Sequence, residues 1–214
     1  PFEDYKIAQT TLYRCQMGAG NGKTYNAVRL FDDPRFAYKT TFLFVTKAHS
    51  AKATIFAEFI AQCPTATVLH GSGKIVATLQ HADGRKLTFA FATVDSLIHQ
   101  VMKPGEIPRV TADSFANKVV HVGKDGIGEN TLSYCGKTVR LDKQALVVGD
   151  EMQDLSTFYL EAFVMLARET LVDVWLIGDK LQSLYAEENA FTKAIDTDGL
   201  PHAQCAEETA PVNE

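Results

Sequence analysis

The sequence predicts an α/β protein, in which a mostly parallel β-sheet carries helices on both faces. The first observation is rhythm, because apolar runs of strand length alternate with stretches of helical periodicity along the 214 residues. The second is the run Thr41–Thr46 (TFLFVT), which is apolar almost throughout, as expected of a strand covered on both faces. The third is a glycine cluster between the first expected strand and the first expected helix.

Short apolar runs predict the strands, and apolar residues that recur every three or four positions predict the helices. The expected strands are residues 11–16, 41–46, 68–69, 87–92, 145–148 and 172–177. The expected helices are residues 23–32, 48–62, 95–102 and 156–169, and the first should stop near Pro34. A turn is expected at Ala82–Gly84, between the strand 87–92 and its predecessor at 68–69. The tail from about Thr197 is expected to be irregular.

The stretch 103–142 interrupts this rhythm, since it is rich in glycine and proline with short polar segments between them. It also contains apolar residues that need cover, so we interpret it as an inserted loop or a small β-rich subdomain and not as a linker. These residues are Val119, Val120, Val122, Leu132 and Val139. We therefore expect one domain over residues 1–214, with 103–142 as an insertion or small subdomain.

The composition is that of an ordinary globular protein, with 46% hydrophobic and 22% charged residues. No apolar run approaches the roughly 20 residues that span a bilayer, so no membrane partner is expected. The four cysteines lie far apart without a C-x-x-C pair, which favours free thiols in a reducing compartment. We expect an intracellular protein, in the cytoplasm or nucleus or in a host cell if it is viral. The sequence has no initiator methionine, so we also expect a piece of a longer polypeptide.

The strongest local signal is the glycine-rich loop at residues 18–24, between the first expected strand and the first expected helix. Glycines let backbone N–H groups approach a phosphate chain and adopt the φ values that this approach requires. The helix that begins at Lys23 would point its positive end at the phosphates. Lys23 would reach the β and γ phosphates, and the Thr24 hydroxyl would hold Mg²⁺. The alternative is a glycine-rich turn with a chance Lys-Thr pair, and the strict pattern has glycine where this chain has Met17. The residues assigned to nucleotide binding are Gly18, Ala19, Gly20, Asn21, Gly22, Lys23, Thr24 and Tyr25.

Two carboxylates follow the expected strand 145–148. Asp150 and Glu151 should lie at the carboxyl edge of the sheet, where open α/β sheets bind their ligands. Asp150 would take Mg²⁺ through water, and Glu151 would orient or deprotonate the attacking water. Such a pair is also common as a solvated turn, and only its combination with the glycine-rich loop makes it a strong signal.

A third polar segment follows the expected strand 172–177. Gln182 stands where it would sense the γ-phosphate or position water. The alternative is a Gly-Asp turn that leads into a polar helix start.

Taken together, these segments resemble the first RecA-like domain of UvrD/Rep-type superfamily 1 DNA helicases. That family's P-loop commonly reads A-G-A-G-S-G-K-T, so Met17 is only a mild departure from it. The segment Asp150–Asp154 resembles the family motif D-E-x-Q-D, and Gly178–Tyr185 resembles G-D-x-x-Q-S-I-Y. Weaker matches are Val45–Ala51, similar to T-x-x-x-A, and Ala92–Leu97, similar to T-F-H-S-F.

The second weak match departs from the family because Asp95 replaces the usual histidine. Tyr25 likewise stands where the family usually has a basic residue. Both departures weaken the inference about DNA contacts more than the inference about the nucleotide.

The resemblance implies an ATP hydrolase that uses MgATP to translocate on single-stranded DNA and unwind duplex, in the 3′ to 5′ direction. It implies catalytic roles for Lys23, Asp150, Glu151 and Gln182, with Thr24 and Asp150 at the metal. A second RecA-like domain of the same polypeptide would supply an arginine, and nothing after Asp196 matches it. The isolated piece is therefore expected to be weakly active or inactive. Replication or repair proteins would be further partners.

The resemblance also implies DNA contacts at Thr46, Thr93 and Tyr185, the last by stacking on a base. The threonines are equally suited to cap the helices that follow them, and the tyrosine to pack under a helix. The formal net charge of −5 argues against a generally basic nucleic-acid binder but allows a local groove. Basic residues in 103–142 would suit a DNA-facing surface or simply a solvated one.

Three other functions remain open from the residues. One is a P-loop NTPase that does not unwind DNA, such as a remodelling or packaging ATPase. Another is a catalytically silent nucleotide-binding module that keeps the fold for protein contacts. A small-molecule kinase is disfavoured, because the sequence has no lid or arginine-rich substrate segment.

Overall fold

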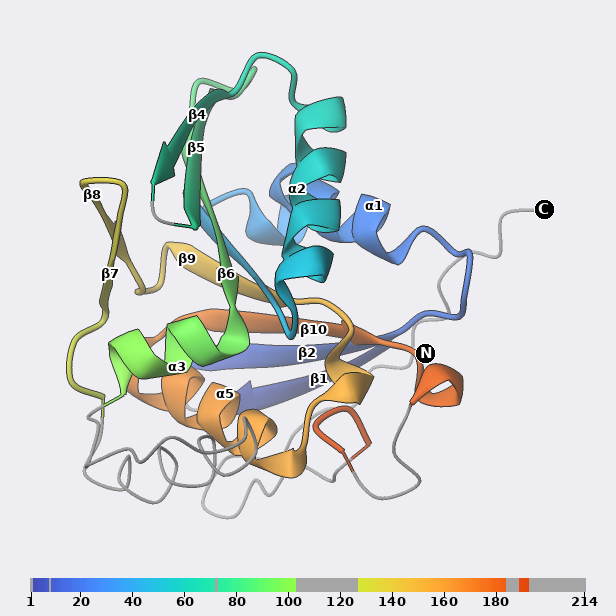
Figure 1. Ribbon diagram of the computed structural model, residues 1–214. Coiled ribbons are helices and arrows are strands. Elements are labelled where there is room, and N and C mark those ends of the chain that lie inside the picture. The colour runs from blue at the N-terminus through green and yellow to red at the C-terminus, as the bar shows by residue number, and fades with distance from the viewer. Residues whose placement is uncertain (1, 8, 72, 103–126, 184–188, 193–214) are drawn as a thin grey trace.

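The structure is a computed structural model that describes residues 2–7, 9–71, 73–102, 127–183 and 189–192 (Figure 1). Tyr185, most of the insertion (103–126) and the tail from Thr197 lie outside the described residues. None of the helices in the described part of the chain is long and apolar enough to cross a membrane.

An eight-stranded mixed sheet forms the centre of the molecule. Its order is β1 (Phe2–Ile7), β2 (Thr10–Gln16), β10 (Asp173–Gly178), β9 (Ala145–Gly149), β3 (Thr41–Thr46), β6 (Lys86–Thr93), β5 (Lys74–Gln80) and β4 (Thr67–Gly71). The central strands β2, β10, β9, β3 and β6 are parallel to one another. The outer strands pair antiparallel: β1 on β2, β5 on β6 and β4 on β5. The predicted α/β class with a mostly parallel sheet is thus confirmed.

Burial explains which strands were visible in the sequence. β9 and β10 are buried at every position, and β3 at all but its first, so each is apolar almost throughout, with Asp173 at the start of β10 as the charged exception. The edge strand β1 carries three charged residues, Glu3, Asp4 and Lys6, and was not predicted. The predecessor of β6 was predicted wrongly: it is β5, because the Ala82–Gly84 turn joins β5 to β6 and the run at 68–69 belongs to β4.

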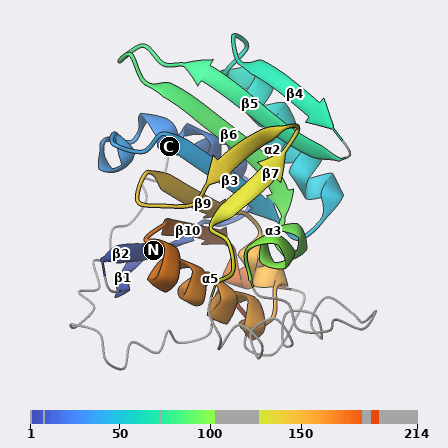
Figure 2. The same ribbon diagram turned by 90° about the vertical axis from the view of Figure 1, so that its left-hand side faces the viewer.

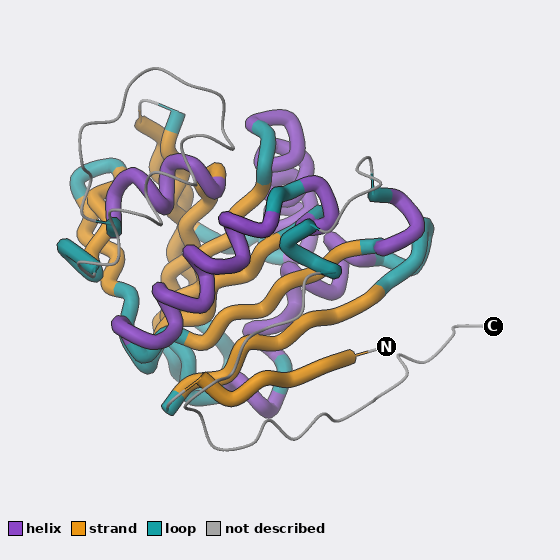
Figure 3. Tube along the Cα trace, turned by 90° about the horizontal axis from the view of Figure 1, so that it is seen from below, coloured by secondary structure: helices purple, strands orange, loops and turns teal. Residues whose placement is uncertain are grey.

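Helices cover both faces of the sheet. Helix α1 (Lys23–Val28), which continues as the 3₁₀ turn η1 (Arg29–Asp32), and helix α2 (His49–Gln62) lie on one face. Helices α3 (Val94–Val101) and α5 (Thr157–Thr170) lie on the other, as Figures 1 and 3 show. The predicted helix 23–32 is therefore present, with its last turn tightened before Pro34.

The two faces have different cores. The α1/α2 face is aromatic, and Phe42, Phe44, Phe89 and Phe91 stack along neighbouring strands β3 and β6. The α3/α5 face is mostly aliphatic. Packing on both sides removes the central strands from water and leaves only their ends accessible, which directs ligands to an edge of the sheet.

The described end of the insertion forms a β-hairpin. Strands β7 (Thr131–Tyr134) and β8 (Lys137–Arg140) are joined by Cys135 and Gly136, which have φ angles of 52° and 72°. Consecutive positive φ angles suit the twist of a two-residue hairpin. Leu132 and Val139 are buried in the same core as α3 and α5, and the hairpin lies beside α3 (Figure 2). This part of the insertion thus packs as an extension of the main domain.

Candidate active site

Three loops meet at the carboxyl edge of the sheet, on the right of Figure 1. The loop after β2 is the glycine-rich loop, the loop after β9 carries Asp150 and Glu151, and the loop after β10 carries Gln182. β10 lies between β2 and β9 in the sheet. Because parallel strands end at the same edge, this order brings the three segments together although they are far apart in the sequence.

The loop after β2 exposes its backbone. Ala19, Gly20, Asn21 and Gly22 are all exposed, and the φ angles of Gly20 and Gly22 are 75° and 68°. These left-handed conformations favour glycine over any residue with a Cβ. The loop begins where the Met17 N–H donates to the Gly178 carbonyl oxygen of β10. Within the described residues, the N–H groups of Gly20, Gly22 and Lys23 have no hydrogen-bond acceptor, so they are available to an anion.

Lys23 joins the three loops. Its Nζ lies 3.0 Å from Gln182 Oε1 and 3.4 Å from Glu151 Oε1, while the side chain is only 9% exposed. An ammonium has three donors, which a phosphate group can also engage. The geometry therefore places the one predicted cation in contact with two of the predicted polar partners.

Thr24 and Asp150 form a second contact between the loops. The Thr24 hydroxyl lies 3.2 Å from Asp150 Oδ2, and Asp150 is buried. Burial raises the pKa of Asp150 most, the neighbouring Glu151 charge raises it further, and hydrogen bonds from Thr24 and from the Glu151 N–H oppose the rise. A hydroxyl and a carboxylate are hard oxygen ligands of the kind that Mg²⁺ prefers. These two residues are thus the pair that fits a magnesium ion.

Glu151 has an unusual backbone. Its φ and ψ angles of 58° and 41° are left-handed, which costs on the order of 1 kcal/mol or more for a residue that is not glycine. Its side chain is 36% exposed, so the carboxylate reaches water as well as Lys23. Strained residues of this kind cluster at active sites.

Gln153 belongs to the site but was given no role from the sequence. It is 2% exposed, its Nε2 donates to Glu151 Oε2 at 2.6 Å, and its Oε1 accepts from the Asp179 N–H at 3.1 Å. The signal was present, because Gln153 is the glutamine of the D-E-x-Q-D segment. Only the structure reveals that its amide bridges two loops.

The predicted DNA-binding threonines both lie at the carboxyl edge, at the ends of β3 and β6. Thr46 is fully buried, and its hydroxyl donates to the Ala48 carbonyl oxygen at 3.0 Å. Thr93 caps α3, where its Oγ1 accepts from the Ser96 N–H at 3.3 Å. The helix-capping alternative therefore describes Thr93 in this state of the protein, and the Thr46 hydroxyl has an internal acceptor.

Tyr25 and Asp95, which differ from the helicase motifs that the sequence resembles, each form a side-chain hydrogen bond. Tyr25 is 46% exposed, and its hydroxyl accepts from Arg29 Nη1 at 3.0 Å. Asp95 accepts a hydrogen bond from the Tyr159 hydroxyl at 2.7 Å, which ties α3 to α5. Tyr25 thus presents an accessible ring beside the loop, while Asp95 holds two helices together.

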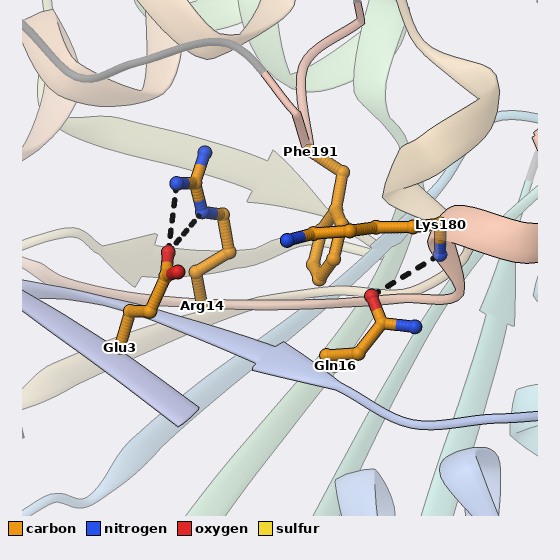
Figure 4. A pocket seen from close by; sticks show the side chains of 5 residues that line it. All are labelled: Glu3, Arg14, Gln16, Lys180 and Phe191. Atoms are coloured by element: carbon orange, nitrogen blue, oxygen red, sulfur yellow. Dashed lines mark hydrogen bonds and ion pairs between the residues drawn. The ribbon is translucent and has the colours of Figure 1, made fainter. Parts of the chain in front are cut away.

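A small hollow lies on the α5 side of β1 and β2 (Figure 4). It is lined by Glu3, Arg14, Gln16, Lys180 and Phe191, and its volume of about 10 Å³ has room for roughly one water molecule. Arg14 is paired there with Glu3 at 2.7 Å. The hollow is too small for a nucleotide, so the candidate site is the open loop edge.

Comparison of the chain with known protein families and with curated proteins finds no match.

Proposed function

We propose that this chain is the ATP-binding, RecA-like motor domain of an ATP-dependent DNA helicase. The observation that carries the proposal is the position of Lys23, whose ammonium contacts both Glu151 and Gln182. Three segments that each suit phosphate chemistry thereby form one site. A glycine-rich turn with a chance lysine would have no reason to meet a strand-end carboxylate and a glutamine from two other loops.

Each residue has a distinct role in the proposed reaction. The exposed N–H groups of the loop and Lys23 bind the phosphate chain, and Lys23 exchanges its present partners for phosphate oxygens. Thr24 and Asp150 hold Mg²⁺, which neutralises charge on the phosphates when bound. Glu151 orients the attacking water and accepts its proton, and Gln182 lies beside the γ-phosphate. A partner-domain arginine completes the charge stabilisation.

The helicase part of the proposal rests on the resemblance of 150–154 and 178–185 to the family motifs. Translocation needs a second RecA-like domain, and single-stranded DNA would run along the carboxyl edge past the ends of β3 and β6. The direction 3′ to 5′ follows from the family alone.

Binding of a fluorescent ATP analogue with Mg²⁺ tests the nucleotide site in the chain itself. Substitution of Lys23 by alanine should weaken binding by about tenfold or more, because a charge-assisted contact to phosphate is lost. Lys86→Ala is the control, since Lys86 is exposed at the start of β6, on the opposite edge. Equal affinity of the Lys23 variant and the parent would overturn the proposed site.

Hydrolysis separates the helicase from its alternatives. In the polypeptide that includes the second motor domain, we expect ATP hydrolysis to rise with single-stranded DNA and to fall to a low, measurable residual rate in Glu151→Gln. Hydrolysis that is indifferent to DNA would indicate another P-loop ATPase. Binding without hydrolysis would indicate a silent module.

A further inference from the structure

We propose that Gln153 is a positioning residue, whose side-chain amide holds the Glu151 carboxylate in place and ties it to the loop that carries Gln182. The inference rests on the proposed function, because the value of a held carboxylate depends on the reaction. It differs from that function in assigning a task to a residue that does not touch the nucleotide.

The first half of the bridge fixes the carboxylate. Gln153 Nε2 donates to Glu151 Oε2 at 2.6 Å, while Lys23 Nζ approaches the other oxygen, Oε1, at 3.4 Å. Within the described residues, these two are the side-chain donors to the Glu151 carboxylate. When Lys23 turns to phosphate oxygens, Gln153 is the donor that keeps Glu151 oriented.

The second half of the bridge fixes the loop after β10. Gln153 Oε1 accepts from the Asp179 N–H at 3.1 Å, and the Gln153 carbonyl oxygen accepts from Ser183 Oγ at 3.3 Å. Asp179 begins the 3₁₀ turn η5 (Lys180–Gln182), and its carboxylate accepts from the Leu181 N–H. Gln153 therefore holds this turn at both of its ends, on either side of Gln182.

The surroundings allow the amide only one orientation. Gln153 is almost fully buried, and a Cβ on Gly178 would lie 2.9 Å from its Oε1. Exchange of the amide oxygen and nitrogen would set N–H against the Asp179 N–H and oxygen against the Glu151 carboxylate. Its direction is therefore determined by the two groups that it joins, which is what a positioning residue requires.

Two variants of Gln153 separate the two contacts. Gln153→Glu keeps an oxygen for the Asp179 N–H but replaces the donor to Glu151 with a repelling carboxylate. Gln153→Met keeps the length of the side chain and loses both contacts. Ser183→Ala is the control for the loop alone, because it removes the bonds of Ser183 Oγ to the Gln153 carbonyl oxygen and from Asn189 Nδ2 and leaves the Gln153 amide in place.

The first readout needs no hydrolysis. The Lys23 ammonium can be followed by ¹⁵N NMR in lysine-labelled chain without nucleotide. We expect Gln153→Glu and Gln153→Met to move the Lys23 signal towards its position in Glu151→Gln, while Ser183→Ala leaves it unchanged. A Lys23 signal that is unchanged in both Gln153 variants would overturn the proposal, whether or not the chain binds or hydrolyses ATP.

The second readout measures turnover in the polypeptide that includes the second motor domain. We expect both Gln153 variants to lower kcat by about tenfold or more with KM changed less than about threefold, because a misplaced base slows chemistry and not binding. In a Glu151→Gln background, the same substitutions should have no further effect on kcat. Additive losses would mean that Gln153 acts independently of Glu151 and would contradict the positioning role. A parent without hydrolysis would instead count against the proposed function.

Discussion

Gly178 lies where three parts of the site come into contact. An added Cβ there would approach Gln153 Oε1 and Phe191 Cδ2, both at 2.9 Å, so the chain has no space for a methyl group. We expect Gly178→Ala to reduce the free energy of unfolding by about 1–3 kcal/mol through overpacking. Urea unfolding of the chain measures this.

The control for that substitution is Gly71→Ala, because the nearest atom to its added Cβ would be Cys135 Sγ at 3.4 Å and its φ angle is not positive. Its loss should be clearly smaller. Similar losses at both glycines would mean that the close approach behind the site is not what makes Gly178 necessary.

His81 gives a pH-dependent contribution from a single side chain. Its Nε2 lies 2.9 Å from Asp32 Oδ1 and its Nδ1 lies 2.8 Å from Asp83 Oδ1, so a carboxylate faces each ring nitrogen. The hydrogen bond with Asp83 raises the pKa of His81 most, and the bond with Asp32 adds to it. The folded-state pKa is therefore above the unfolded value of about 6.5.

The sign of this effect follows from that order. The stabilisation is fully present below the unfolded pKa and disappears as the pH rises through the folded pKa. We expect the parent chain to lose about 0.5 kcal/mol more unfolding free energy than His81→Gln between pH 5.5 and 8.5, a small value because the pair is near the surface. Denaturant titrations at the two pH values give the difference. Identical pH dependence in both proteins would mean that the pKa of His81 is the same in the folded and unfolded states, and that the two carboxylates do not raise it.

At the scale of elements, the sequence predicted best where one strand is buried on both faces. β3 has the same bounds as the predicted run 41–46, and α2 differs from its prediction by a single residue. β1 and β5 were not predicted because polar residues interrupt them, Glu3, Asp4 and Lys6 in β1 and Thr78 and Gln80 in β5, so neither shows a continuous apolar run. An apolar run in the sequence thus identifies a strand that is buried on both faces, whereas an edge strand gives only a weak sequence pattern.

For the candidate site, the individual residues were predictable from local sequence, but their contacts with one another were not. Lys23, Asp150, Glu151 and Gln182 were predicted as residues that follow apolar strands, because each motif is local. Their contact depends on the insertion of β10 between β2 and β9, which no local pattern contains. The bridging amide of Gln153 depends on two loops at once, so its role was not predictable from its own neighbours.

At the scale of the whole molecule, clusters of buried polar residues lie at both edges of the sheet. The carboxyl edge holds the candidate site, and the opposite edge holds a buried ion pair, Lys39 Nζ to Asp173 Oδ2 at 2.7 Å. The Tyr38 hydroxyl and the Thr11 N–H also donate to Asp173, and Lys39 donates to the Lys143 carbonyl oxygen. Burial lowers the pKa of Lys39, and Asp173 opposes that change. This cluster joins the starts of β2, β10 and β9 to the segment before β3.

Loss of one partner from this pair should destabilise the fold without touching the site. Asp173→Asn keeps the shape but removes the carboxylate paired with the Lys39 ammonium, which is 1% exposed. We expect unfolding to cost about 3–5 kcal/mol less than in the parent, measured by urea unfolding at pH 7. The loss should shrink at higher pH, since a buried lysine without its partner then sheds its proton.

The double variant Lys39→Met, Asp173→Asn should recover part of that stability, because no uncompensated charge is left in the interior. Affinity for the fluorescent ATP analogue should be unchanged in all three proteins at temperatures where they are folded, since the ion pair and Lys23 are at opposite ends of the strands. An Asp173→Asn chain that stays as stable as the parent would mean that the pair contributes little. A chain that stays folded yet loses nucleotide affinity would mean that the two edges are coupled through β10.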